Sequence, residues 1–365
     1  MAETMTPINV GLLGAANIAR LVWASIHRVG HRVTLVGCRD NDRGVEFVRE
    51  VCDALSIPEA TRPRVTTYDE VVASPDVDLV YMPIPVTARD DWVVECVANS
   101  KHVVGETPPA ATAERLRSWI EALDEKELLY MDGTVDSHGK RVQEVAAAAK
   151  TLGPIKHMHS NHCRNAPPEL LGDDVRTDPA LEPHGALGDM GWCSIRYFLH
   201  VMELRMPVEV TGRIIKTDGG KDAIVQFSGE LTFDVDGNKT VASLFAALNS
   251  MDEGTLTVAG TEAVLRMKDM CHPISGRPAS WTITRERTVP RECNWDVVRE
   301  VETFHTDEHT ETRRDKMWED VGHILCRNGA GRLVASEEQR RYWSMLSWKT
   351  QVVMDRMLES ARCSG

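Results

Sequence analysis

The sequence has no apolar run that approaches the roughly 18 residues needed to cross a membrane as a helix. Its opening residues, MAETMTP, contain neither a basic region nor an apolar core, so we expect no signal peptide. Positive charge is also in deficit, because 42 Lys and Arg residues face 55 Asp and Glu residues, for a formal net charge of -13. Sequence-independent binding of nucleic acid needs a cationic surface, so we expect neither a nucleic-acid nor a membrane partner.

The sequence also lacks the cysteine spacing of a disulfide scaffold or a zinc knuckle. Its nine cysteines are an odd number, and no two of them form a C-x-x-C pair. Scattered cysteines of this kind are typical of a reduced intracellular protein, so we expect a cytoplasmic location.

At 365 residues the chain is long enough for two domains, and its hydrophobic pattern changes near the middle. In the first part, short apolar runs alternate with helical patterns. The expected strands are residues 8–13, 33–37, 79–82, 102–105 and 128–131, with helices at 18–29, 43–54, 90–99 and 112–123. Near-continuous apolar strands alternating with helices predict an α/β domain of the Rossmann type, a doubly wound parallel sheet covered on both faces.

After about Lys150 the strands follow one another through turn signals such as Asp236-Gly237-Asn238. The expected strands are residues 155–162, 208–216, 223–227, 230–235, 240–248, 254–258 and 263–267, with helices at 190–202 and 337–360. This pattern predicts an α+β domain with a large open, mainly antiparallel sheet. We therefore divide the chain into a dinucleotide-binding domain (1–131), a substrate and oligomerisation domain (132–335) and a C-terminal helix that packs back between them (336–365).

The turn after the first strand carries the pattern Gly14-x-Ala16-x-x-Ala19, a variant of the dinucleotide fingerprint G-x-G-x-x-G/A. The fingerprint requires a tight turn, close approach of the backbone to a pyrophosphate, and a small residue where helix meets strand. We expect Gly14, Ala16, Asn17 and Ile18 to bind the cofactor. The extra methyl group of Ala16 reduces the clearance, and a tight turn without a ligand is the alternative.

The end of the second strand predicts which dinucleotide is bound. An acidic residue there holds the ribose hydroxyl of NAD, whereas an arginine accommodates the phosphate of NADP. Arg39 therefore favours NADP(H), while Asp40 beside it keeps NAD(H) as an alternative. Arg39 as a plain surface charge is the other interpretation.

These motifs, taken with several others along the chain, resemble the Gfo/Idh/MocA oxidoreductase family, and in particular its dihydrodiol dehydrogenase-like members. The matching segments are GLLGAANIAR (11–20), YDEVV (68–72), PDVDLVYMPIP (75–85), KHVVGETP (101–108), GALGDMGW (185–192) and the closing helix from Trp348 to Ala361. The resemblance implies that Pro83, Pro85, Glu106 and Trp192 lie at the cofactor, although Trp192 also suits a helix core. It further implies a homodimer or higher oligomer formed through the open sheet.

The resemblance implies an NAD(P)-dependent enzyme that transfers hydride to or from a small polyol, sugar, dihydrodiol or carbonyl compound. Family members that act on sugars use a lysine where this chain has Thr107, and a tyrosine or histidine where it has Cys193. A threonine hydroxyl supplies no positive charge, and a thiol reaches less far than a phenol. Asp189 is kept, and Arg89 stands at a further position that is often histidine.

Two interpretations follow from these departures. In the first, Asp189, Cys193 and Thr107 carry the proton chemistry of an altered oxidoreductase, with help from Arg89 or a nearby histidine. In the second, the chain is a catalytically degenerate dinucleotide-binding regulator or scaffold. A cluster of histidines and a cysteine at residues 157–163 is interpreted as a sheet face or cleft wall, so no metal site is predicted.

Overall fold

The computed structural model describes residues 5–167, 175–271, 278–308, 310–329 and 331–363. The chain forms two compact units. The N-terminal unit comprises residues 1–138 and 311–351, and the C-terminal unit comprises residues 139–310 and 352–365. No helix among the described residues combines the length and the apolar character that a membrane crossing requires.

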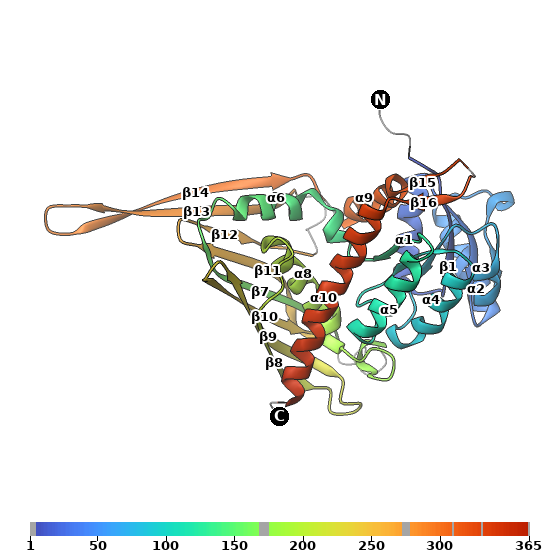
Figure 1. Ribbon diagram of the computed structural model, residues 1–365, viewed down its shortest axis with the longest axis horizontal. Coiled ribbons are helices and arrows are strands. Elements are labelled where there is room, and N and C mark those ends of the chain that lie inside the picture. Colours follow the sequence, from blue (N-terminus) through green and yellow to red (C-terminus); the bar gives the residue numbers. More distant parts are fainter. Residues whose placement is uncertain (1–4, 168–174, 272–277, 309, 330, 364–365) are drawn as a thin grey trace. The chain divides into compact units, whose positions relative to one another are not determined.

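The N-terminal unit is built on a six-stranded parallel sheet with the order β3-β2-β1-β4-β5-β6. Its strands are β1 (Asn9–Leu13), β2 (Arg32–Gly37), β3 (Arg64–Thr66), β4 (Leu79–Met82), β5 (His102–Gly105) and β6 (Tyr130–Asp132). The helices are α1 (Asn17–Arg28), α2 (Asn41–Ala54), α3 (Tyr68–Ala73), α4 (Arg89–Ala98), α5 (Ala113–Asp124) and α9 (Thr310–Ile324), and the small pair β15 (Leu325–Arg327) and β16 (Leu333–Ala335) follows. This strand order is that of a Rossmann fold, which confirms the predicted doubly wound sheet (Figure 1).

The central strands of this sheet are buried because both of their faces are covered. Leu12 in β1, Val80 in β4 and Val103 in β5 have no exposed surface. Strands covered on both sides need apolar residues at every position, and this explains why the sequence pattern identified them. The order of the strands reverses between β1 and β4, so ligands are expected at the carboxyl ends of these two strands.

The C-terminal unit contains an eight-stranded sheet with the order β14-β13-β12-β11-β7-β10-β9-β8. The strands are β7 (Ile155–Asn165), β8 (Glu209–Thr217), β9 (Ile224–Val235), β10 (Asn238–Ala247), β11 (Asn249–Gly260), β12 (Val264–Met267), β13 (Ala279–Pro290) and β14 (Trp295–Thr306). Only the pairing of β7 with β10 is parallel, which confirms the mainly antiparallel open sheet. Helices α6 (Lys140–Ala149) and α8 (Trp192–Val201) pack against each other, α8 contacts β7, and a π-helical turn (Leu187–Gly191) leads into α8.

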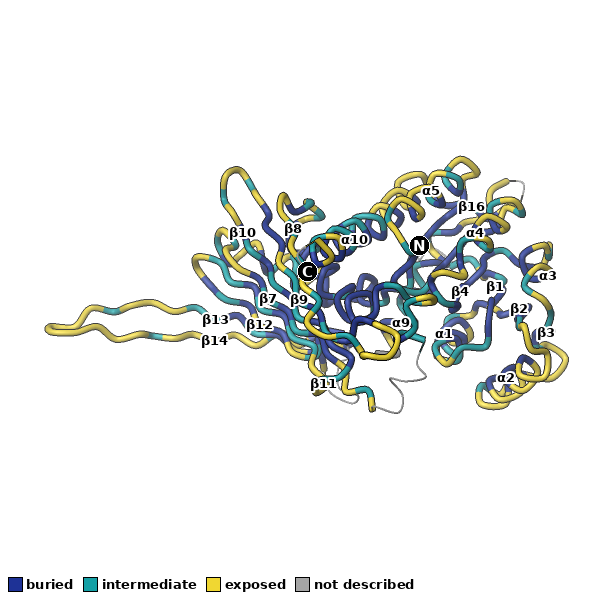
Figure 2. Tube along the Cα trace, turned by 90° about the horizontal axis from the view of Figure 1, so that it is seen from below, coloured by how far each residue is buried: buried dark blue, intermediate teal, exposed yellow. Residues whose placement is uncertain are grey.

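Some elements differ from the expectations. The two strands expected at residues 223–227 and 230–235 are one continuous strand, β9. The polar segment 303–316, to which no element was assigned from the sequence, contains the end of β14 and the start of α9. The hairpin of β13 and β14 was not predicted, and most of its residues are exposed (Figure 2).

The helix expected at residues 337–360 is α10 (Glu337–Cys363), which contributes its first part to the N-terminal unit and its last turns to the C-terminal unit. The Asp236-Gly237 turn joins β9 and β10, with φ of 53° and 82° at its two central residues. Positive φ at both positions is the geometry of a tight two-residue hairpin, so the turn expected from the sequence is confirmed.

Candidate functional site

Gly14 forms the bend between β1 and α1, and its conformation requires glycine. Its φ of +107° lies in the region that residues with a side chain rarely adopt. A Cβ added there would lie 3.1 Å from Cγ2 of Ile84 and 3.4 Å from the hydroxyl of Tyr68. The amide of Gly14 donates to the carbonyl of Gly37 at 2.9 Å, and this bond fixes the bend to the end of β2.

The helix that follows begins with exposed amide groups. Ala16 is its N-cap, with an extended backbone, and no side chain in the described part of the chain caps this end. Asn17 and Ile18 begin the helix and Ala19 is fully buried, where it donates to the Ala16 carbonyl at 3.0 Å. The first amides of a helix lack partners within the helix and carry the positive end of its dipole. This geometry suits a phosphate.

The structure brings the end of β4 to the same place. The carbonyl oxygen of Pro83 lies 4.0 Å from the position that a Cβ of Gly14 would take, and Ile84 is closer still. Pro85 is half-buried and begins the next 3-10 turn. Gly14 and Pro83, which the sequence analysis assigned to the cofactor, thus come together where the strand order reverses.

Two arginines lie beyond the end of β2. Arg39 is exposed, and Nη2 of Arg43 donates to the carbonyl of Ala15 in the bend at 3.4 Å. Burial raises the pKa of Tyr68, and the charges of Arg39 and Arg43 oppose this rise, so both guanidinium groups act at the same point. The sequence analysis did not single out Arg43. Its position in the first turn of α2, directly after β2, is the feature from which a role at the cofactor could have been predicted.

Asp40 has a structural role that bears on the cofactor. Its Oδ1 accepts a hydrogen bond from the amide of Arg43 at 3.0 Å, which caps the start of α2. An aspartate at a helix N-cap satisfies a backbone donor that otherwise has no partner. This bond holds the Asp40 carboxylate at the start of the helix, so the carboxylate is less available to bind a ribose hydroxyl.

The loop after β5 carries Glu106 and Thr107, both half-buried. The hydroxyl of Tyr81 donates to Oε1 of Glu106. Burial raises the pKa of Glu106, although the bond from Tyr81 and the charge of Arg89 counteract part of this effect. Thr107 precedes Pro108 across a cis peptide bond. Its own contact with a ligand stays a prediction.

Arg89 is buried and binds backbone carbonyl groups. Its Nε donates to Ile84 at 2.8 Å, and its Nη1 donates to Glu106 and Pro108 at 2.5 Å each and to Pro109 at 3.1 Å. These bonds tie the ends of β4 and β5 together. These hydrogen bonds favour a positioning role for Arg89 over the role in proton transfer that was considered from the sequence.

In the C-terminal unit, Asp189 lies in the π-helical turn before α8. Its Oδ1 forms an ion pair with Nε of Arg176 at 2.8 Å. Its Oδ2 is buried and has no hydrogen-bond partner among the described residues. Arg176 was not predicted, because nothing in its local sequence pattern distinguishes it from a surface charge.

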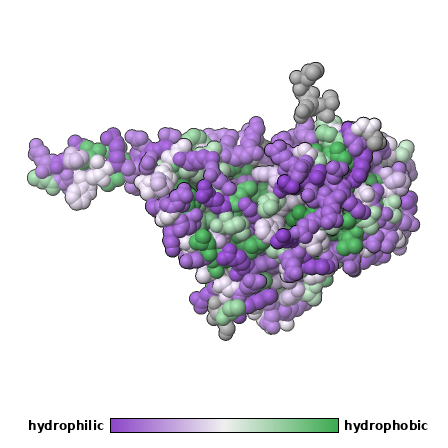
Figure 3. All heavy atoms as spheres, viewed as in Figure 1, coloured by the Kyte–Doolittle hydropathy of each residue, from purple (hydrophilic) through white to green (hydrophobic). Residues whose placement is uncertain are grey.

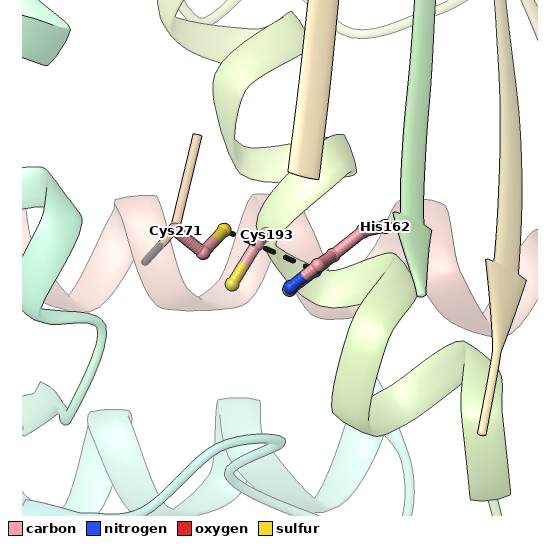
Figure 4. Close-up of side chains that lie close together, drawn as sticks. All are labelled: His162, Cys193 and Cys271. Carbon is pink, nitrogen blue, oxygen red and sulfur yellow. Dashed lines mark hydrogen bonds between the residues drawn. The ribbon is translucent and has the colours of Figure 1, made fainter. Parts of the chain in front are cut away.

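Cys193 belongs to a cluster with His162 and Cys271, which come from α8, β7 and the segment after β12 (Figure 4). A ring nitrogen of His162 and the two sulfur atoms all lie within 4.8 Å of one another. His162 and Cys271 are buried, whereas Cys193 is half-buried. Burial lowers the pKa of His162, but the hydrogen bond and charge of Cys193 outweigh it, so the pKa is raised.

The remaining residues of interest are not members of this cluster. Trp192 is fully buried in the core of the C-terminal unit, with the Arg196 guanidinium 5.2 Å from its ring centroid. A contact between Trp192 and a cofactor stays a prediction. His157 and His159 stack with ring centroids 6.3 Å apart, and both contact Ser243.

Two family models match the chain. An oxidoreductase model with an NAD-binding Rossmann fold matches residues 8–134, and the GFO/IDH/MocA C-terminal domain model matches residues 141–266. The chain is 26% identical over 265 residues to a dTDP-3,4-didehydro-2,6-dideoxy-alpha-D-glucose 3-reductase of Streptomyces antibioticus, covering 71% of this chain and 75% of the relative. It is 22% identical over 279 residues to a trans-1,2-dihydrobenzene-1,2-diol dehydrogenase of Xenopus tropicalis, covering 73% and 77%.

The fold has solved counterparts. One is a 3-ketoreductase from Actinomadura kijaniata, crystallised in complex with NADP and TDP-benzene. The two structures agree with a TM-score of 0.75 at 19% identity, over 97% of this chain and 98% of the other. At this level of identity the agreement concerns the fold alone.

Proposed function

Since the chain belongs to the Gfo/Idh/MocA oxidoreductase family, we propose that it transfers a hydride between NADP(H) and a small polyol, sugar, dihydrodiol or carbonyl compound. The observation that carries this proposal is the Gly14 bend with the uncapped start of α1 behind it. The amides of Asn17 and Ile18 would hold the pyrophosphate, and the Gly14 bend and Pro83 would leave the backbone clear for it.

NADP(H) is the better fit than NAD(H). Arg39 and Arg43 supply two guanidinium groups beyond β2, which suit the additional ribose phosphate of NADP. Asp40, the residue that would favour NAD, caps α2. The ketoreductase from A. kijaniata, crystallised with NADP, is a relative in fold that supports this choice.

When bound, the nicotinamide supplies or takes up the hydride. The chain's own residues must then hold and move a proton. Asp189 has a carboxylate oxygen without a partner among the described side chains, and Cys193 has a half-exposed thiol beside His162. Thr107 would donate a hydrogen bond from its hydroxyl. In this proposal Asp189, Cys193 and Thr107 are the catalytic residues, and Glu106 and Pro85 shape the cofactor side.

The substrate class comes from the relatives. Their names specify a ketosugar nucleotide and a dihydrodiol, both small compounds with a carbon–oxygen bond that hydride transfer can oxidise or reduce. We therefore propose a substrate of the same class for this chain.

A catalytically degenerate regulator is the second candidate, and one contact favours it. The retained carboxylate of Asp189 is paired with Arg176 at 2.8 Å, and that pair would oppose proton transfer. Such a protein would bind NADPH and give no turnover.

Calorimetric titration with NADPH and NADH, followed by assays on a panel of sugars, polyols, dihydrodiols and dicarbonyl compounds, tests the proposal. We expect NADPH to bind more tightly than NADH and to be oxidised with at least one carbonyl compound. NADPH binding without turnover would support the catalytically degenerate regulator. Absence of binding by either dinucleotide would contradict both candidates.

We also propose that the chain is a cytoplasmic homo-oligomer formed through the open sheet. Apolar side chains are exposed on the hairpin of β13 and β14. The exposed fractions of Trp295, Val297 and Val301 are 66%, 56% and 56%. Hydrophobic patches interrupt the mostly hydrophilic surface of this hairpin (Figure 3). A second copy of the chain would cover them.

Sedimentation velocity tests the assembly. A variant with Trp295→Lys and Val297→Lys should shift the protein to monomer. Val94→Lys, at a residue of α4 with 55% exposure, is the matched control and should leave the assembly unchanged. A wild-type monomer at all concentrations would contradict this part of the proposal.

A further inference from the structure

We propose that His162, Cys193 and Cys271 bind one zinc ion within the C-terminal unit. His162 comes from β7, Cys193 from α8 and Cys271 from the segment after β12, and the three side chains converge (Figure 4). Sγ of Cys271 lies 3.8 Å from Nδ1 of His162, and all three ligand atoms lie within 4.8 Å of one another.

The distances suit a tetrahedral ion after a small contraction. Zinc lies about 2.3 Å from cysteine sulfur and about 2.0 Å from histidine nitrogen, so tetrahedral ligands are roughly 3.5–3.8 Å apart. The contact between Cys271 and His162 is already at this separation. The remaining distances need to shorten by at most about 1.3 Å, which a change in the rotamer of Cys193 can supply.

Buried contacts hold two of the ligands in place. Nδ1 of His162 lies 2.8 Å from the carbonyl oxygen of Met190, which holds the imidazole ring in place before an ion binds, and zinc on this nitrogen would replace that bond. The carbonyl of Met270, directly before Cys271, accepts from Nη2 of Arg141 at 2.6 Å and from the Tyr197 hydroxyl at 3.2 Å. The cluster is therefore fixed by its surroundings.

The type and charge of the donors select the ion. Two thiolates and a neutral imidazole favour zinc over magnesium or calcium, which prefer oxygen ligands. The two thiolates also neutralise a divalent cation, so the complex carries no net charge in a buried place. Burial raises the pKa of Cys271 well above its usual value, and Arg141 opposes this rise. A bound cation removes the thiol proton outright.

Three protein ligands leave a fourth position open, as in catalytic zinc sites. The open position lies toward Cys193, because that residue is half-buried while His162 and Cys271 are buried. If the proposed hydride transfer is correct, the ion would act as a Lewis acid on the substrate oxygen, and Cys193 would serve as a ligand of the ion in place of its role in proton transfer.

Metal binding can be measured without any substrate. The full-length chain is reduced, treated with a chelator and titrated with Co²⁺ while its absorption spectrum is recorded. We expect one equivalent of Co²⁺ to produce thiolate-to-cobalt charge transfer and the d–d bands of a tetrahedral site. Zn²⁺ should then displace the cobalt stoichiometrically.

Variants identify the ligands. Cys193→Ser, Cys271→Ser and His162→Gln should each weaken Zn²⁺ binding by at least about 100-fold. Cys163→Ser is the matched control, since Cys163 is a buried cysteine of β7 next to His162 but outside the cluster, and it should bind like the wild type. Circular dichroism of each variant verifies that it is folded.

The proposal is overturned if the reduced wild-type chain shows no thiolate-to-cobalt band. It is also overturned if folded ligand variants bind like Cys163→Ser, or if Cys193 and Cys271 form a disulfide and take up no metal after reduction. NADPH titration of the same samples is independent of these results. A failed cofactor proposal would therefore leave the metal result intact, and the reverse also holds.

Discussion

In the N-terminal unit, the groups that would meet a ligand are mainly backbone amides, whereas in the C-terminal unit they are two thiols, an imidazole and a carboxylate. The Gly14 bend keeps its geometry with Ala16 at the second position of the fingerprint. In the C-terminal unit, the family resemblance predicts a phenol or imidazole at the position that Cys193 occupies. The comparison suggests that recognition through the backbone tolerates substitution more readily than chemistry carried by side chains.

The largest effect is expected at Asp189, the carboxylate of the side-chain site. Asp189→Asn should lower turnover by about 10²–10⁴-fold, because an amide cannot take up a proton. Steady-state kinetics with NADPH and the best carbonyl substrate measure this change. Asp222→Asn, at an exposed residue with φ of 59°, is the control and should keep full activity. Unchanged turnover in Asp189→Asn would remove Asp189 from the catalytic set.

The backbone site can be broken at one glycine. Gly14→Val should weaken NADPH binding by about 100-fold or more, because the added side chain strains the bend and displaces the amides from the phosphate. Calorimetric titration gives the affinity. Gly30→Val is a close control, since Gly30 also has a positive φ (+87°) but nothing lies within 4 Å of its Cβ position. Equal loss of affinity in both variants would show a general loss of folding instead.

His102, buried at the start of β5, tests the pH response of the N-terminal unit. Burial lowers the pKa of His102 to about 4, and its Nδ1 accepts a hydrogen bond from the amide of Leu129. As the pH falls, the His102 imidazole therefore takes up a proton in the unfolded chain at a higher pH than in the folded chain. Above about pH 6.5 this imidazole should cost no stability. The free energy of unfolding should then fall by roughly 3 kcal/mol as the pH drops to 4, with no further loss from this group.

Urea unfolding between pH 7 and pH 4 measures this loss. In His102→Gln the part of the pH dependence that comes from this imidazole should disappear, although the variant is less stable at pH 7. A slope identical to that of the wild type would show that His102 does not carry the effect.

The smallest effect is expected at Arg43, which sharpens the choice of dinucleotide. Arg43→Ala should weaken NADPH binding about tenfold, because one charge-assisted contact with the ribose phosphate is lost. NADH, which lacks this phosphate, should bind the variant as it binds the wild type. Equal weakening for both dinucleotides would place Arg43 at the pyrophosphate or in the fold.

The sequence predicted the N-terminal unit well for a physical reason. Strands covered on both faces, such as β1 and β4, are continuous apolar runs, and the bend at Gly14 follows directly after one of them. The hairpin of β13 and β14 was missed because charged residues interrupt its apolar ones, and most of its residues are exposed.

The cluster of His162, Cys193 and Cys271 could not be predicted from the spacing of these residues in the sequence. Cys271 and His162 are 109 positions apart, so only the fold brings them together. The sequence grouped His162 with His157 and His159, yet His162 is buried in the structure while the other two are not. Side chains alternate between the faces of a strand, and this explains why neighbouring histidines of β7 separate.

The most direct test of the central claim is a crystal structure of the chain grown with NADP⁺. The account predicts pyrophosphate oxygens within hydrogen-bond distance of the amides of Asn17 and Ile18, with the ribose phosphate between Arg39 and Arg43. A Gly14 bend closed by the methyl group of Ala16, or a dinucleotide bound elsewhere, would contradict it.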